Sequence, residues 1–154
     1  MQSAISDAAM GIHVLEIHHH AVRIDSEPPK VEAVRNFYAD VLGLQADPGR
    51  PTIPGVPGFW INVGEGGQIH LIGGEQPSPL AKGPGQDPTI PHVALAVADI
   101  QEAKAELDRQ KVPYWSMTGI NGPAAEQIFI NDPSGNMVEL HQVDQCRCRV
   151  INRM

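Results

Sequence analysis

The sequence predicts an α+β fold built from two tandem βαβββ modules, and three observations support this prediction. The segment FWINVGEGGQIHLI at 59–72 aligns without a gap on IFINDPSGNMVELH at 128–141. Upstream, HHAVRID at 19–25 aligns on HVALAVAD at 92–99. A stretch rich in proline and glycine, 73–91, separates the two copies. A repeat of this period indicates that each copy is one structural unit.

Within each copy the pattern predicts a strand, a helix and three shorter strands. Val31, Val34 and Val41 recur at helical spacing in the first copy, and glycine follows where the helix should end. In the second copy Asp99 stands at a helix N-cap with Glu102 three residues later, which is a capping-box pattern. The predicted helices are 31–43 and 99–110; the predicted strands are 12–24, 44–47, 59–63, 68–72, 92–97, 113–117, 126–131 and 137–142. We expect Phe37, Tyr38 and Leu42 in the core.

The domain organisation follows from these elements. We expect an N-terminal tail at 1–11, a first module at 12–72, a linker at 73–91, a second module at 92–143 and a disordered C-terminal tail at 144–154. The chain has 154 residues, which suffices for one domain with a real core. Its 15 glycines and 14 prolines indicate many turns between short elements.

Charge and cysteine content restrict the partners. The formal net charge of −7 argues against nucleic acid or an anionic membrane surface, because both require a basic patch. No apolar run is long enough to span a bilayer, and the first residues do not read as a signal peptide. Cys146 and Cys148 are the only cysteines, and one C-x-C is no disulfide framework. We therefore expect a cytoplasmic protein without a disulfide.

Alternation along the strands selects the residues that share a face. His19 shares its face with Ala21 and Arg23, whereas His18 and His20 belong to the other face and are expected to point outward. The repeat makes His19 equivalent to His92 and makes His70 equivalent to Glu139. His141 shares a face with Glu139, one step further along the strand.

Two equivalent modules would bring His19, His70, His92 and Glu139 together around a pseudo-two-fold axis. Three imidazoles and one carboxylate suit a divalent transition metal such as Zn, Ni, Fe, Mn or Co. Fewer protein ligands than coordination positions would leave room for water or substrate, as catalysis requires. The sequence therefore predicts a metal site at these four residues.

Several of these motifs resemble the vicinal-oxygen-chelate superfamily, which includes glyoxalase I, extradiol dioxygenases and bleomycin-resistance proteins. The resemblance spans about residues 14 to 143 and rests on HHAVRI, NFYADVLGL, HVALAV and FINDPSGNMVELHQ. It implies a curved, mostly antiparallel eight-stranded sheet that cups a metal, and a homodimer. It also implies His19, His70, His92 and Glu139 as the ligands.

The resemblance further implies roles in substrate binding and catalysis. Arg23 matches an arginine that in glyoxalase I lines the pocket and holds the carboxylate of a thiol cosubstrate. His141 is a second candidate for contact with the substrate. Glyoxalase I has a carboxylate at the position of His70, so here only Glu139 remains as a base beside the metal.

Three functions remain open at this point. The first is a metal-dependent glyoxalase-type lyase or isomerase that acts on a small substrate with vicinal oxygens, with or without a thiol adduct, through a metal-stabilised enediolate. The second is a non-haem Fe(II) extradiol-type dioxygenase, which would use His19, His92 and Glu139 on iron. The third is a protein that binds a drug or antibiotic without chemistry.

Overall fold

A computed structural model describes residues 11–154 of the protein, so most of the predicted N-terminal tail lies outside the described residues. The elements of the first half are β1 (Val14–Arg23), α2 (Pro28–Asp40), β2 (Gly58–Val63) and β3 (Gly67–Ile72). Those of the second half are β4 (His92–Val97), α3 (Ile100–Arg109), β5 (Trp115–Thr118), β6 (Glu126–Asn131) and β7 (Met137–Gln142). A short 3₁₀ helix, η1 (Val150–Arg153), ends the chain.

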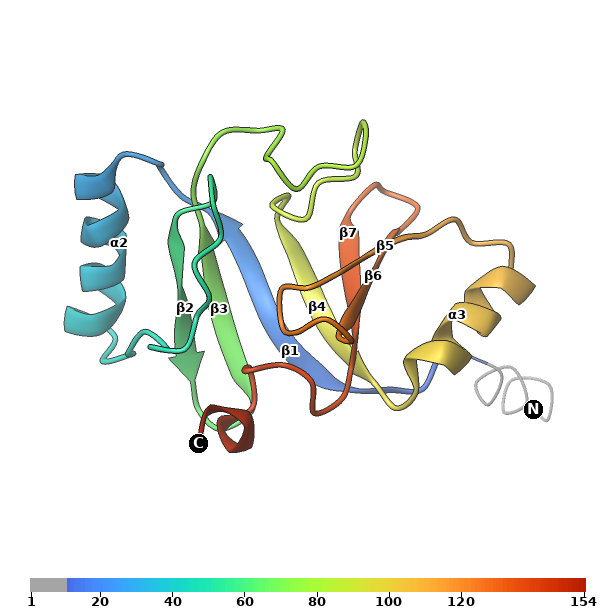
Figure 1. Ribbon diagram of the computed structural model, residues 1–154. Coiled ribbons are helices and arrows are strands. Elements are labelled where there is room, and N and C mark those ends of the chain that lie inside the picture. The colour runs from blue at the N-terminus through green and yellow to red at the C-terminus, as the bar shows by residue number, and fades with distance from the viewer. Residues whose placement is uncertain (1–10) are drawn as a thin grey trace.

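The strands form one mixed, open sheet in the order β2-β3-β1-β4-β7-β6-β5 (Figure 1). Neighbouring strands are antiparallel except for two parallel pairs, β1 with β3 and β4 with β7. The two halves pair in the same way, because Ala21 lies opposite His70 and Ala94 lies opposite Glu139. Each of these alanines follows its strand's candidate histidine by two residues, as the repeat implies.

Seven strands are found in residues 11–154, where eight were expected. The segment 44–47 makes only an isolated bridge between Ala46 and Ile61. Two backbone hydrogen bonds join it to β2, from Asn62 N to the Gln45 oxygen and from Asp47 N to the Trp60 oxygen. Alternate residues donate to the partner strand in an antiparallel ladder, so Gly49 N would be the next donor after Asp47 N. It donates to the Asp47 carboxylate instead, over 2.9 Å, and the ladder ends there.

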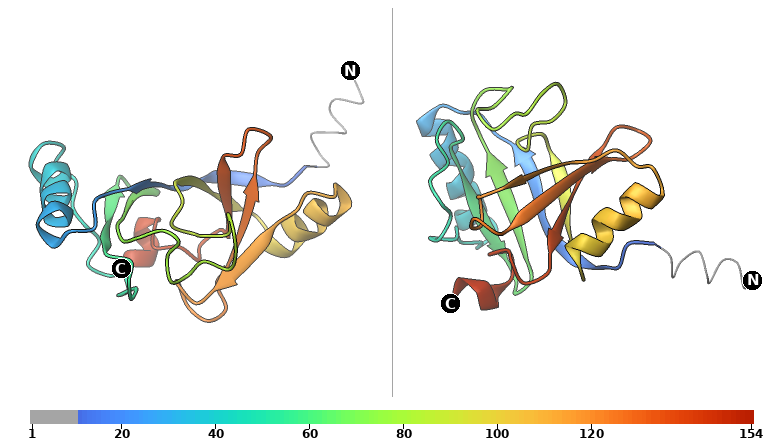
Figure 2. Two further views of the ribbon diagram at one scale, coloured as in Figure 1. Left: turned by 90° about the horizontal axis from the view of Figure 1, so that it is seen from above. Right: turned by 45° about the vertical axis from the view of Figure 1, so that its right-hand side comes forward.

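The two helices lie at opposite ends of the sheet (Figure 2). Helix α3 covers the second half, where Ala103 and Leu107 pack with Val97, Ile128 and Leu140 in a buried cluster. Its N-cap is Asp99, as predicted, and the carboxylate accepts from the backbone N–H groups of residues 101 and 102. Among residues 11–154, no helix combines the length and the apolar character that crossing a bilayer requires.

Helix α2 lies beside the edge strand β2 and departs from prediction in two ways. It begins three residues earlier than expected, because Pro28 and Pro29 occupy its first turn, where a missing N–H costs nothing. The prediction that Phe37 and Leu42 belong to the core is wrong, since each is 53% exposed. Val31 is the one buried residue of the helix. Much of its apolar surface therefore faces away from the sheet.

The C-terminal segment is folded against the molecule, so the prediction of a disordered tail at 144–154 is wrong. The prediction that the protein has no disulfide is wrong as well. Cys146 and Cys148 form a disulfide and are buried. Arg147 between them makes a two-pronged ion pair with the buried Asp47, through contacts of 2.7 and 2.8 Å. Arg153 adds hydrogen bonds to the backbone oxygens of residues 147 and 148. The Asp47–Arg147 pair joins residues 100 apart in the sequence, which is why the C-x-C pattern alone did not reveal that this segment packs on the sheet.

Candidate metal centre

The two central strands, β1 and β4, carry the histidines of the candidate site. Their antiparallel register places His19 opposite Ala94 and Ala21 opposite His92. Small alanines opposite each imidazole leave space for the rings, which lie 5.5 Å apart between centroids. Glu139 reaches the same place from β7, the parallel neighbour of β4. All three side chains are buried.

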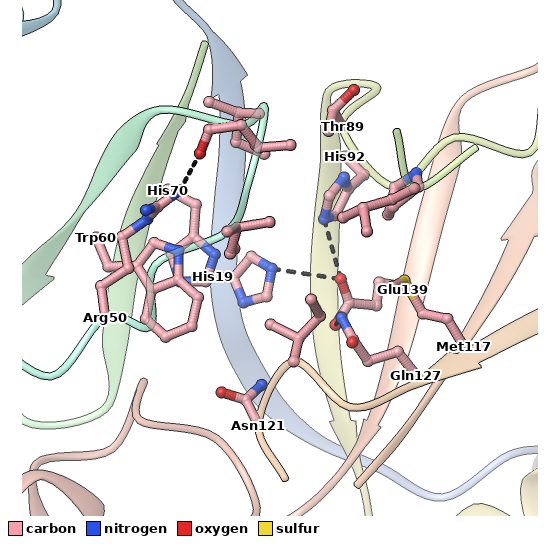
Figure 3. Close-up of a pocket in the computed structure, with 16 residues that line it drawn as sticks. His19, Arg50, Trp60, His70, Thr89, His92, Met117, Asn121, Gln127 and Glu139 are labelled. Atoms are coloured by element: carbon pink, nitrogen blue, oxygen red, sulfur yellow. Dashed lines mark hydrogen bonds and ion pairs between the residues drawn. The ribbon is translucent and has the colours of Figure 1, made fainter. Parts of the chain in front are cut away.

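These three residues converge on one point (Figure 3). Oε1 of Glu139 lies 3.0 Å from Nε2 of His92 and 3.5 Å from Nε2 of His19. One ligand atom from each residue lies within 4.8 Å of the other two. Two imidazoles and one carboxylate arranged in this way form a donor set suited to a divalent transition metal.

The hydrogen bonding of His92 shows that the centre fits a cation. Nδ1 of His92 lies 2.6 Å from the carbonyl oxygen of Ile90, and a carbonyl can only accept, so Nδ1 carries a proton. In the neutral ring Nε2 then has a lone pair, and this lone pair faces Oε1 of Glu139. Two acceptor atoms at 3.0 Å repel each other unless a proton or a metal ion lies between them.

The charge state of the centre follows from its surroundings. Burial alone would raise the pKa of the Glu139 carboxyl, but the charges and hydrogen bonds of His19 and His92 outweigh burial and hold that pKa well below its usual range. Burial lowers the pKa of His19, although Glu139 opposes the shift. Burial would also lower the pKa of His92, but Glu139 outweighs burial and raises that pKa. A metal ion would bind in place of a proton, because it needs the carboxylate ionised and the imidazoles neutral.

His70 lies beside this group with its ring stacked between two others. Its centroid is 3.8 Å from that of His19 and 4.5 Å from that of Trp60, and the planes are nearly parallel. Nε2 of His70 donates to Oε1 of Gln68 over 2.9 Å. The ring of His70 lies parallel to that of His19, so its nitrogens lie beside those of His19. His70 therefore does not point at Glu139 as His92 does. Burial is also the first reason that the pKa of His70 lies well below its usual value.

The predicted substrate contacts, Arg23 and His141, lie elsewhere. Arg23 donates to the backbone oxygens of Gly73 and Gly74, and it does not line the pocket over the centre. His141 is fully buried and does not line the pocket either. Its Nε2 lies 3.3 Å from Nδ2 of Asn121.

Several residues that sequence reasoning missed shape the site instead. Gln127 on β6 donates from Nε2 to Oε2 of Glu139 over 3.2 Å. Arg50 enters the pocket from the 48–58 loop; burial lowers the pKa of its guanidinium. Nη2 of Arg50 donates to the Val56 oxygen over 2.8 Å, whereas Nε has no partner in the described part of the chain. The other lining residues are mostly apolar: Ile53, Val56, Trp60, Ile72, Leu80, Pro88, Met117 and Ile120.

His18 also differs from its prediction. His20 is exposed as expected, but His18 is fully buried. Ile17 pairs with Leu95 and His19 pairs with Ala94, so two steps along β1 match one step along β4. Such a bulge breaks the strict alternation of side chains. Two consecutive histidines therefore lie inside, and the ring of His18 meets the edge of His141 at 5.7 Å between centroids.

The fold and the site together define an α+β protein with one mixed, open sheet and a candidate metal centre between two equivalent halves. A family model described as the Glyoxalase/Bleomycin resistance protein/Dioxygenase superfamily matches residues 16–140. The chain belongs to this superfamily.

Individual relatives agree with this assignment. The chain is 27% identical over 143 residues to a protein named Glyoxylase I 4 from Arabidopsis thaliana, covering 92% of this chain and 76% of the relative. Methylmalonyl-CoA epimerase from Mycobacterium tuberculosis has a similar structure, with a TM-score of 0.62, 22% identity and coverage of 84% and 88% of the two chains. A Streptomyces coelicolor methylmalonyl-CoA epimerase variant in complex with 2-nitronate-propionyl-CoA also has a TM-score of 0.62, at 16% identity and coverage of 85% and 96%.

Proposed function

We propose that the protein is a metal-dependent lyase or isomerase of the glyoxalase type, which moves a proton at a carbon next to a carbonyl in a small substrate with vicinal oxygens. The observation that carries the proposal is the buried Glu139 carboxylate, which faces two imidazole nitrogens. The relative named Glyoxylase I 4 supports the same reaction class.

His19, His92 and Glu139 would hold a divalent transition-metal ion. His70, whose ring stacks on that of His19, stays the proposed fourth ligand. Such an ion supplies positive charge that attracts the substrate's two oxygens and acidifies the adjacent C–H group. Zn, Ni, Fe, Mn and Co all accept this donor set.

Glu139 would take the proton from the substrate carbon and return it to the neighbouring carbon. Its Oε2 accepts a hydrogen bond from Gln127, which fixes the carboxylate plane relative to the pocket. The low pKa of Glu139 keeps the group ionised. Apolar walls around it exclude water, which strengthens every electrostatic interaction in the site.

The pocket has room for the small reacting part of a substrate, and it can also bind an anionic group on that substrate. Its cavity volume is about 60 Å³, several times the roughly 10–15 Å³ that one water needs. A thiol adduct would place only its reacting end there and leave its carrier outside. Arg50, with its unpartnered Nε, offers a charged donor to a substrate carboxylate.

The test is turnover by metal-loaded protein. Apo protein is loaded separately with Ni²⁺, Zn²⁺, Co²⁺ and Mn²⁺, and methylglyoxal is supplied with glutathione or another thiol. We expect thioester formation, and a loss of roughly 10²–10⁴-fold in kcat for Glu139→Gln. Glu75→Gln removes an exposed carboxylate and serves as the control. Absence of turnover with every metal and thiol would reject the proposal.

A second candidate is supported by the same three ligands. Two histidines and one carboxylate that leave coordination positions open are typical of non-haem Fe(II) oxygenases. An extradiol-type dioxygenase would consume oxygen when Fe(II) protein meets a catechol, and His92→Asn would abolish that uptake. Oxygen consumption without glyoxalase turnover would favour this candidate over the first.

We also infer a homodimer. Two separate groups of apolar residues lie exposed in the single chain: Phe37, Val41 and Leu42 at the C-terminal end of α2, and Val14, Leu15 and Ile17 on β1. Exposed apolar surface can mark an interface. Light scattering after gel filtration should give twice the chain mass, and Phe37→Glu should shift the protein to the monomer. The exposed Asn36→Asp is the control.

A further inference from the structure

A second cluster of donor atoms lies on the far edge of the His19 ring. Nε2 of His19 faces Glu139, whereas its Nδ1 lies 3.3 Å from Sγ of Cys148. Cys146, Cys148 and His18 each offer one ligand atom there, and these atoms lie within 4.8 Å of one another. The three residues are between 0% and 1% exposed, and none of them lines the pocket.

The imidazole of His18 has no polar partner. Neither of its nitrogens makes a hydrogen bond within residues 11–154, although the side chain is fully buried. Nδ1 of the neighbouring His141 is likewise unpartnered in the described chain. A buried polar atom without a partner costs about 1–3 kcal/mol, so most such atoms in proteins have one. The unpartnered His18 therefore points to a ligand beside the sulfur atoms.

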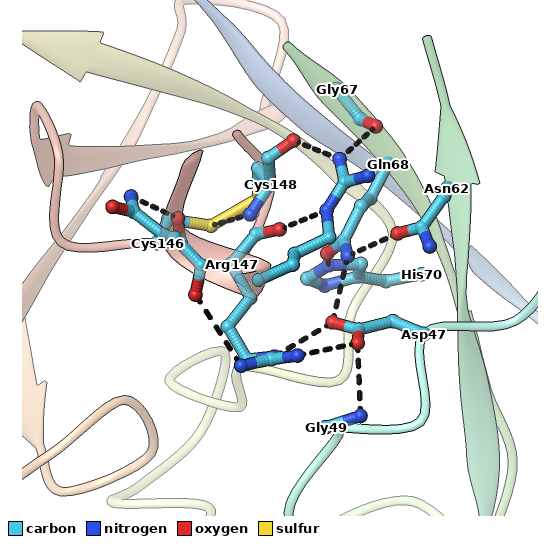
Figure 4. A network of polar contacts seen from close by, with 11 residues as sticks. Asp47, Gly49, Asn62, Gly67, Gln68, His70, Cys146, Arg147 and Cys148 are labelled. Carbon is cyan, nitrogen blue, oxygen red and sulfur yellow. Dashed lines mark hydrogen bonds and ion pairs between the residues drawn. A yellow bond between two sulfur atoms is a disulfide. The ribbon is translucent and has the colours of Figure 1, made fainter. Parts of the chain in front are cut away.

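The backbone around the two cysteines is fixed independently of their sulfur chemistry (Figure 4). Asn152 donates to the Cys146 oxygen over 2.7 Å, and Arg153 donates to the Cys148 oxygen. The Asp47–Arg147 ion pair holds the residue between them. Opening the disulfide would thus leave both thiols near His18.

We propose that the reduced protein holds a soft transition-metal ion, Zn²⁺ in the first place, between Cys146, Cys148 and His18. A dithiol reductant donates two electrons and two protons to the disulfide, becomes a disulfide itself and leaves two thiols. Binding of the ion releases both thiol protons, and a His18 nitrogen gains the partner that it lacks. Two thiolates and one imidazole select Zn²⁺ over harder ions, and His141 or water completes four-coordination. In a reducing cytoplasm the thiol form would be the resident one.

Anaerobic titration with Co²⁺, as a coloured substitute for Zn²⁺, tests the proposal. Thiolate ligands give an intense sulfur-to-cobalt charge-transfer absorption, whereas the imidazole and carboxylate of the candidate metal centre do not. We expect this absorption in dithiol-reduced protein, and we expect it to disappear when Zn²⁺ displaces the Co²⁺. Disulfide-containing protein should lack it.

Variants assign the ligands. Cys146→Ser and Cys148→Ser should each abolish or greatly weaken the absorption, and His18→Asn should raise the dissociation constant by at least roughly tenfold. His20→Asn, an exposed neighbour on the same strand, should change nothing. Circular dichroism verifies that each variant is folded.

Three results would overturn the proposal. One is reduced wild-type protein without the absorption. Another is unchanged Co²⁺ affinity in His18→Asn. The third is absorption that disappears in His19→Asn but persists in Cys146→Ser, because Cys148 would then bind together with His19 and His70.

Discussion

Gln127 controls the half of the Glu139 carboxylate that faces away from the histidines, through the hydrogen bond from its Nε2 to Oε2. Partners of this kind orient a metal ligand, and their loss typically lowers metal affinity by about 10–100-fold. We expect a loss of this size for Gln127→Ala, measured by competition with a coloured chelator. Gln101→Ala, on the exposed face of α3, should bind as tightly as wild type. Equal affinity in both variants would contradict the role given to Gln127.

We expect substitution of Arg50 to weaken substrate binding strongly and substitution of Arg23 to weaken it little. Arg50 lines the pocket with an unpartnered Nε, whereas Arg23 is engaged with the backbone of residues 73 and 74. A charged hydrogen bond contributes about 1.5–3 kcal/mol, so Arg50→Met should lower kcat/KM more than tenfold for a substrate with a carboxylate. The loss should lie mainly in KM. Arg23→Met should have a small effect on KM; the reverse ranking of the two variants would restore Arg23 as the substrate contact.

The sequence alone identified the site residues that the repeat makes equivalent. It missed the residues that reach the site only through tertiary packing. His19 and His92 were identifiable because both begin the same motif. Arg50 lies in a loop with several prolines, whose path depends on contacts to β2 and cannot be derived from alternation. Gln127 could have been found, since its place on β6 opposite His141 follows from the hairpin register. Glu139 lies two residues before His141 on the same face of β7, so Gln127 is its diagonal neighbour.

At the scale of elements, strand and helix types followed from periodicity, and the errors arose where backbone chemistry overrides it. The predicted strand at 44–47 is a single bridge, because Gly49 N donates to the side chain of Asp47 and not to β2. The bulge in β1 brought His18 inside, because one extra residue reverses the side-chain alternation for part of the strand. A bulge leaves no mark in a run of three histidines, so alternation alone could not select the inward pair.

The linker is an ordered element whose centre is Asp87. Its carboxylate accepts from both the backbone N–H and the hydroxyl of Ser78 and of Thr89, over 2.6 to 2.9 Å. The linker also supplies Leu80, Pro88 and Thr89 to the pocket. Asp87→Ala would leave buried donors without a partner, at about 1–3 kcal/mol for each donor that water cannot reach.

We expect this variant to open the linker before the rest of the molecule. Lys82 is the only lysine or arginine in 73–91, so trypsin reports on the segment directly. Cleavage after residue 82 should be faster in Asp87→Ala than in wild type or in Glu75→Gln, which changes an exposed linker carboxylate. Unchanged cleavage would mean that other contacts hold the linker.

At the scale of the whole molecule, the C-terminal segment connects the first half of the sheet to the centre. Arg147 pairs with Asp47, Asp47 accepts from Gln68 over 3.1 Å, and Gln68 accepts from His70. This chain of contacts runs from the last residues to a candidate ligand, across 100 residues of sequence between Asp47 and Arg147. Truncation of 144–154 should therefore disturb metal binding as well as stability.

The Asp47–Arg147 pair also makes the stability of the protein depend on pH in a defined direction. Burial would raise the pKa of Asp47, but Arg147 and the hydrogen bonds from Gly49 and Gln68 lower it below its unfolded value. The pair's contribution is therefore complete above the ordinary aspartate pKa of about 3.9 and is lost as the pH falls through the lower, folded value.

Asp47→Asn should cost about 1–3 kcal/mol at neutral pH, or roughly 2–4 °C in Tm for each kcal/mol. The exposed Asp40→Asn is the control, and the deficit of Asp47→Asn relative to wild type should shrink below about pH 4. A deficit that stays constant from pH 7 to pH 3 would show that the carboxylate's charge does not stabilise the segment.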